Sequence, residues 1–166
     1  MATVGEAALR SGSWAQRGRA ATAGVMLPAM PDVQVLRVGP TTRRRARSAS
    51  PYEEAFGFSR AVRVGKRVLV SGTAPIWPDG SCPPEASIQA ERCFEIILTA
   101  MAELGARPED VVRTRMYIVD PADAEAVGRA HRAAMGVARP AATMIVVARL
   151  LDPRWRIEVE AEAVTR

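Results

Sequence analysis

Three glutamates, Glu158, Glu160 and Glu162, alternate with apolar residues in the last ten positions of the sequence. In an extended strand this spacing puts the three carboxylates on one face. A carboxylate on a sheet face that a neighbouring element covers has a raised pKa and can position water as a general base. The alternative is a ladder of ion pairs with Arg113 and Arg115 across the sheet. We expect the ladder for Glu160 and Glu162, and the reactive carboxylate at Glu158.

His131 and two cysteines are the other side chains with catalytic or metal-binding potential. His131 is the single histidine, and it falls on the apolar face of a helical pattern, which favours a packed, hydrogen-bonded role. Cys82 and Cys93 are eleven residues apart and have no Cys or His partner at the spacing of a zinc site. The sequence therefore predicts no metal site and no disulfide framework, and it indicates reduced thiols in a cytoplasmic protein.

The common catalytic signatures are missing from the sequence. Ser71 stands in the run Leu69-Val70-Ser71-Gly72-Thr73, which is not the G-x-S-x-G of a nucleophile elbow. There is no H-E-x-x-H, no Walker loop and no G-x-G-x-x-G before a helix. No apolar run approaches the roughly 18–20 residues that span a bilayer, so we expect no membrane partner.

The net charge of +5 suggests a nucleic-acid partner until its location is considered. Residues 1–50 hold eight arginines and two acids, whereas residues 51–166 hold 15 basic and 16 acidic side chains. The run Arg43 to Arg47 could contact phosphates, but it has no interleaved aromatic residues, so nucleic acid is not the expected partner. We expect a basic, disordered extension over residues 1–50 and a folded domain over residues 51–166.

The origin of residues 1–29 has more than one interpretation. An Arg-rich, acid-poor stretch is also typical of a transit peptide. A translation start at Met26 or Met30 would remove most of the stretch altogether. We expect the fold of residues 51–166 to be independent of it.

Regular patterns begin near Phe58. Two short apolar runs around Gly65-Lys66 predict a β-hairpin, and the Pro- and Gly-rich residues 72–84 predict a loop. Apolar residues at helical spacing from Ala90 to Leu104 predict a helix that ends at Gly105. The later elements are a strand over 111–119, a helix from Asp120 to Gly136, a strand over 142–149 and a strand over 156–164.

The resulting order is β-β-α-β-α-β-β. It predicts an α+β fold in which one mixed sheet carries two helices on one face. The opposite face then holds the glutamate row together with Arg113 and Arg115. So many charges on a sheet face need either water or another subunit with compensating partners.

The sequence from about Gly57 onward resembles the Rid family (RidA/YjgF), the reactive intermediate or imine deaminases. The matching stretches cover about two-thirds of the chain in the family's order and spacing. They are 58–65 (FSRAVRVG), 70–75 (VSGTAP), 110–115 (DVVRTR), 139–143 (RPAAT), 147–150 (VARL) and 157–161 (IEVEA).

This resemblance implies a chorismate-mutase-like α+β fold. It also implies a homotrimer whose sheets pack into a central barrel, with three clefts between subunits. In the family's deaminases the cleft binds the carboxylate of a small enamine or imine. Water then attacks the C=N carbon, ammonia leaves, and no metal or organic cofactor takes part.

Some positions match the family's functional residues. Glu158 resembles the glutamate that positions water, and the backbone N–H groups at Gly72 and Thr73 could hold an anion. Thr143 stands where the family has Ser or Thr. His131 matches a position that is often aromatic and near the cleft.

Two positions depart from the family pattern. Ala142 stands where the deaminases have the arginine that grips the substrate carboxylate through a bidentate ion pair, a contact that alanine cannot make. Phe58 stands where a tyrosine hydroxyl often contacts the same carboxylate. Arg60 or Arg139 could substitute for the lost clamp. The resemblance leaves two functions open, a deaminase for small imines or enamines and a non-catalytic trimer that binds a small metabolite in the same cleft.

Overall fold

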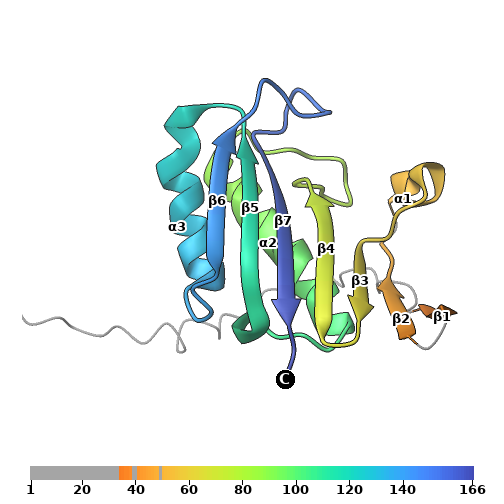
Figure 1. Cartoon of the computed structure of the whole chain (residues 1–166). Coiled ribbons are helices and arrows are strands. Elements are labelled where there is room, and N and C mark those ends of the chain that lie inside the picture. Colours follow the sequence, from red (N-terminus) through yellow and green to blue (C-terminus); the bar gives the residue numbers. More distant parts are fainter. Residues whose placement is uncertain (1–33, 39–40, 49) are drawn as a thin grey trace, which may run out of the picture.

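A computed structural model describes residues 34–38, 41–48 and 50–166. These residues form one seven-stranded sheet in the order β1-β2-β3-β4-β7-β5-β6 (Figure 1). The strands are β1 (Gln34–Val38), β2 (Thr41–Ala46), β3 (Ala61–Val64), β4 (Arg67–Thr73), β5 (Val111–Ile118), β6 (Ala141–Val146) and β7 (Ile157–Val164). The helices are α1 (Pro51–Phe56), α2 (Ala86–Glu103) and α3 (Ala124–Met135).

The sheet is mixed, as predicted. β5 and β6 run parallel and are connected through α3, whereas every other neighbouring pair is antiparallel. β7 lies between β4 and β5 and so joins the two halves of the sheet. Its side chains alternate between buried and half-buried from Ile157 to Ala163.

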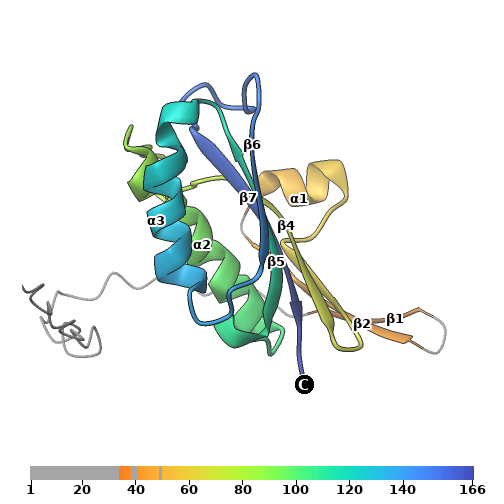
Figure 2. The same cartoon turned by 60° about the vertical axis from the view of Figure 1, so that its left-hand side comes forward.

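The helices α2 and α3 cover one face of the sheet (Figure 2). Between them and the sheet lies the apolar core, in which Phe94, Ile97 and Met101 of α2 are almost completely buried. α2 ends just before Gly105, whose φ of 77° is the left-handed conformation that favours glycine. The predicted α+β class is thus confirmed. In the described part of the chain no helix has the length and apolar character needed to cross a membrane.

His131 of α3 packs into this helix-covered side of the sheet. Its Nε2 lies 2.9 Å from the Thr114 hydroxyl on β5, and its ring meets Phe94 edge-to-face with the centroids 5.6 Å apart. Burial lowers the pKa of His131, so the imidazole is neutral at pH 7. The packed, hydrogen-bonded role predicted from its helical position matches these contacts.

The boundary expected at residue 50 differs from the observed one. β1 and β2 lie within the predicted extension, and β2 pairs with β3 from Arg43↔Val64 to Ala46↔Ala61. The strand lacks apolar alternation, but arginines in and next to it have acceptors. Arg44 donates to the Glu103 carbonyl, and Arg47, just after the strand, pairs with Glu54 at 3.1 Å. The remaining part of that extension, residues 1–33, lies outside the described residues.

Gln89 on α2 fixes the loop that precedes β7. This completely buried side chain donates to the carbonyls of Pro83 and Arg154 at 2.8 and 2.9 Å. Its Oε1 accepts the N–H of Arg156 at 2.7 Å. One amide thereby satisfies three backbone groups in two loops, which a leucine of similar size could not do.

Gln89→Leu is expected to lower the free energy of unfolding by about 2–3 kcal/mol, because it leaves three backbone groups that face this buried position without partners. Chemical denaturation measures the change. Glu91→Leu on the exposed side of the same helix is the matched control and should shift stability by less than about 0.5 kcal/mol. Equal effects of the two substitutions would contradict the assigned role of Gln89.

Candidate functional site

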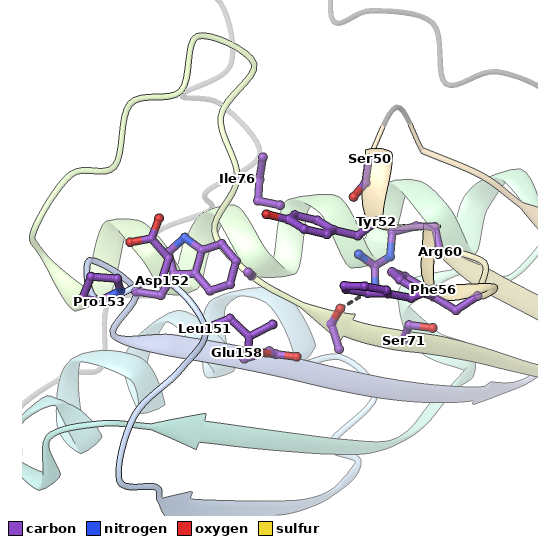
Figure 3. Close-up of a pocket in the computed structure, with 14 residues that line it drawn as sticks. Ser50, Tyr52, Phe56, Arg60, Ser71, Ile76, Leu151, Asp152, Pro153 and Glu158 are labelled. Atoms are coloured by element: carbon purple, nitrogen blue, oxygen red, sulfur yellow. Dashed lines mark hydrogen bonds between the residues drawn. The ribbon is translucent and has the colours of Figure 1, made fainter. Parts of the chain in front are cut away.

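A cavity of about 650 Å³ opens between α1, the loop after β4 and the loop before β7. In Figure 3, Tyr52 of α1 and Ile76 lie on one side of this cavity and Leu151 on the other, with Glu158 on β7 below them. A cavity with an apolar lining and a few polar groups is the usual form of a small-molecule site.

The apolar part of the lining is mostly aromatic. Tyr52 and Phe56 are one helical turn apart on α1, and their rings stack with centroids 5.6 Å apart. Phe58, just before β3, and Trp155, before β7, add two more rings. The two rings of α1 do not belong to the apolar core, since Phe56 is 69% exposed and Tyr52 is 51% exposed.

Of the three glutamates on β7, Glu158 is the one whose carboxylate has no partner among the described residues. Tyr117 donates its hydroxyl to Glu160 at 2.7 Å, and Arg115 pairs with both Glu160 and Glu162. Among the residues that the structure describes, none forms a hydrogen bond or an ion pair with the Glu158 carboxylate. The predicted ladder is therefore present for Glu160 and Glu162, with Arg115 as its cation.

Burial raises the pKa of Glu158 above its ordinary value of 4.5. The neighbouring Arg60 guanidinium opposes this shift, and the negative charge of Glu160 adds to it. A carboxylate with a raised pKa is more basic than an exposed glutamate, which suits a group that accepts a proton from water.

Gly72 lies directly against this carboxylate. A Cβ atom added at Gly72 would stand 2.1 Å from Oε1 of Glu158, well inside van der Waals contact. The pairing of β4 with β7 shifts between Val70 and Thr73, so β4 carries an extra residue at this point. The bulge brings the β4 backbone close to Glu158, and only glycine leaves room for the observed position of the carboxylate.

Arg60, which directly precedes β3, contacts the same segment of β4 around Gly72 from the side opposite β7. Its guanidinium donates to the Gly72 carbonyl, and its own carbonyl accepts the N–H of Ser71 at 3.1 Å. The side chain is only 6% exposed, and burial lowers its pKa while Glu53 and Glu158 raise it. Arg60, Gly72 and Glu158 thus form one connected unit.

The structure brings three of the predicted site residues together: Phe58, Gly72 and Glu158 all line the cavity. Thr73 does not line it. This residue is completely buried, and its hydroxyl donates to the Ser71 carbonyl at 2.8 Å. His131 is separated from the cavity as well, because it lies on the helix-covered side of the sheet against Thr114.

Ala142 and Thr143 lie on β6 at the edge of the sheet, where both are exposed. β5 separates β6 from β7, so neither residue lines the cavity within one chain. Of the two arginines considered as replacement clamps, Arg60 lines the cavity, whereas Arg139 is exposed at the start of β6.

The lining residues on α1 and in the loop before β7 were not predicted. A signal for α1 is present in the sequence: Pro51 occupies the first turn, acidic residues follow it, and Gly57 ends the helix with a φ of 72°. Tyr52 and Phe56 at i and i+4 give this short helix one aromatic face. Trp155 and Leu151 lie in an irregular loop and carry no periodic signal.

The cavity's polar groups do not form a cation site. Asp152 is engaged by the Arg154 guanidinium at 2.7 Å. Within residues 34–38, 41–48 and 50–166, no cluster of three or more His, Cys, Asp or Glu side chains could hold a metal ion. The arrangement instead offers one unpartnered, partly buried carboxylate beside an aromatic wall.

The family model for Endoribonuclease L-PSP matches residues 49–165. An uncharacterized protein of Streptomyces coelicolor is 42% identical over 123 residues, which cover 72% of this chain and 90% of that protein. The 2-iminobutanoate/2-iminopropanoate deaminase of Escherichia coli is 28% identical over 113 residues, or 66% of this chain and 88% of the enzyme.

The crystal structure of Rv2704 from Mycobacterium tuberculosis, a member of the YjgF/YER057c/UK114 family, superposes with a TM-score of 0.69 at 36% sequence identity. The match covers 74% of this chain and 99% of that protein. The family match over residues 49–165 and these relatives agree with the resemblance found in the sequence motifs. The chain belongs to the YjgF/RidA family.

Proposed function

We propose that this protein hydrolyses the C=N bond of a small imine, or of the enamine in equilibrium with it, and releases ammonia. The observation that carries this proposal is Glu158, a partly buried carboxylate that no described residue pairs, placed at the cavity with a raised pKa. The deaminase activity named for the Escherichia coli relative supports the same reaction class.

The reaction needs one group that moves a proton and one surface that positions the substrate. Glu158 accepts a proton from water as the water oxygen bonds to the C=N carbon. The protonated Glu158 then returns the proton to nitrogen, which gives a carbinolamine. Glu158 next transfers the remaining hydroxyl proton to the same nitrogen as the C–N bond breaks, and a carbonyl compound and ammonia leave. Gly72 and Arg60 act as positioning residues, because the first sets the place of the carboxylate and the second fixes Gly72.

Ribonuclease chemistry, which the name of the family model mentions, has less support from this chain. Hydrolysis of RNA commonly relies on a histidine that can take up and release protons, and the His131 ring is packed against Phe94 and Thr114. Two basic residues of β2 and the segment after it are also engaged: Arg44 donates to the Glu103 carbonyl and Arg47 pairs with Glu54.

The proposal includes a homotrimer with inter-subunit clefts, working in the cytoplasm as the isolated cysteines indicate. β6 is an uncharged edge strand whose backbone is open to a neighbour, and its Ile145 and Val146 are about half exposed. Ala142 and Thr143 on this strand would reach a cleft only from a second copy. Ala142 offers no charge there, so the substrate is one that does not depend on a carboxylate clamp.

Glu158→Gln is expected to reduce ammonia release from imines by at least about 100-fold, because glutamine cannot accept the proton from water. In the wild-type protein, kcat/KM should fall as the pH drops through the Glu158 pKa, since only the ionised carboxylate acts as a base. Because burial raises this pKa, the fall should be centred above pH 4.5. A coupled assay for ammonia across pH 4–8 measures both effects.

Glu160→Gln is the matched control on the same strand. This carboxylate is already paired with Tyr117 and Arg115, so its loss should change kcat/KM by only a few-fold. If no imine is hydrolysed faster than in free solution, while a metabolite still raises the melting temperature of both wild type and Glu158→Gln, the non-catalytic binding function is correct instead.

Gly72→Ala is expected to lower kcat about ten- to 100-fold with little loss of thermal stability, because the new methyl group occupies the place of the Glu158 carboxylate. That side chain is flexible, so it can move aside without unfolding the sheet. Gly128→Ala on α3, where a Cβ atom meets nothing within 4 Å, is the control and should leave kcat unchanged. A Gly72→Ala protein with wild-type kcat would contradict the assigned contact.

Deletion of residues 1–29 should leave both the assembly and the cleft intact, since the described sheet begins at Gln34. Light scattering is expected to give three chains per particle for the full chain and for the truncated protein alike. Monomers after truncation would show that the deleted residues hold the assembly together.

A further inference from the structure

The aromatic wall of the cavity has no role in the proton transfers described above. Tyr52 and Phe56 form a stacked pair on α1, on the side of the cavity opposite Leu151 (Figure 3). Phe56 and Leu151 are 69% and 86% exposed, far more than side chains that stabilise a core. Large apolar side chains gathered around one opening commonly mark a binding surface.

We infer that this site selects imines that carry an aromatic ring or a comparably large apolar group and that lack a carboxylate. The inference rests on the proposed function and names its substrate class. The imine of an arylalkyl amine is the simplest member of this class. Its ring would lie against Tyr52 and Phe56, with the C=N carbon next to Glu158.

The size of the cavity supports a large substituent. Its volume of about 650 Å³ lies within the range of roughly 300–1,000 Å³ that holds drug-sized ligands. A three-carbon imino acid would leave most of this space unfilled. A phenyl group in contact with the rings would bury apolar surface and add aromatic stacking.

The charges at the cavity disfavour an anionic substrate. Arg60 is its one lining cation among the described residues, and this guanidinium is buried and donates to the Gly72 carbonyl. The unpaired Glu158 would repel a second carboxylate. A protonated imine is instead attracted by Glu158 and by the faces of the aromatic rings.

The reaction on such a substrate is balanced without any co-reactant other than water. Water forms the new C–O bond at the C=N carbon, and one of its protons passes through Glu158 to nitrogen. The remaining proton of the new hydroxyl then passes through Glu158 to the same nitrogen as the C–N bond breaks, and the products are an aldehyde or ketone and ammonia. Two-electron oxidation of a primary amine is a reaction that supplies such a substrate.

The test compares four imines, each made in situ by a flavin-dependent oxidase. They are derived from 2-phenylethylamine, propylamine, phenylalanine and alanine, so that ring and carboxylate vary independently. For the full-length protein, kcat/KM from ammonia release is expected to be highest for the 2-phenylethylamine imine. It should exceed the value for the propylamine imine by about tenfold or more, the factor expected for burial of one ring.

Phe56→Ala is expected to lower kcat/KM for the 2-phenylethylamine imine about tenfold and for the propylamine imine less than about twofold. The side chain is mostly exposed, so the fold does not depend on it. Tyr52→Phe keeps the ring and should preserve the preference. Val137→Ala, at an exposed apolar position outside the cavity, controls for general effects.

The outcomes separate this inference from the proposed function. If all four imines are hydrolysed equally fast, or those with a carboxylate fastest, the inference is overturned and the proposed function stands. The inference is also overturned, and the proposed function stands, if Phe56→Ala lowers kcat/KM equally for the 2-phenylethylamine and propylamine imines. If no imine is hydrolysed faster than in free solution, the proposed function fails and this inference fails with it.

Discussion

The close approach of β4 to β7 at Gly72 is the constraint on which the candidate site depends. A side chain at that position would occupy the place of the Glu158 carboxylate, so the glycine and the glutamate require each other. Arg60 secures the approach by donating to the Gly72 carbonyl from β3's side of the sheet. Three strands that are adjacent in the sheet thereby fix one carboxylate beside a cavity that α1 and two loops enclose.

Much of the fold could be predicted because its signals are local and periodic. The hairpin around Gly65, the helix that ends at Gly105 and the alternating strand Ile157–Val164 each follow from residue spacing. β1 and β2 could not be predicted in this way. The first five residues of β2 are all threonine or arginine, and the strand is stabilised by pairing with β3 and by distant acceptors such as the Glu103 carbonyl.

The site was predictable only where a residue's role follows from its strand position or from the family motif. Alternation placed Glu158 on the polar face, and the motif pointed to Phe58 and Gly72. The sequence predicts an ion-pair ladder for Glu160 and Glu162 with both Arg113 and Arg115. It could not show that Arg115 pairs with both glutamates, because this depends on register across β5 and β7. Nor could it place Trp155, since the loop that carries this ring is held by the buried amide of Gln89.

The position of β7 in the sheet has a consequence for the order in which the protein can fold. This strand follows the other six along the sequence, yet it occupies the space between β4 and β5. Before residues 157–164 have been synthesised, the halves β1–β4 and β5–β6 have no strand pairing to join them, and the edges of β4 and β5 are open. Because Glu158 is part of this strand, a growing chain acquires the carboxylate of the candidate site in the same step that closes its sheet.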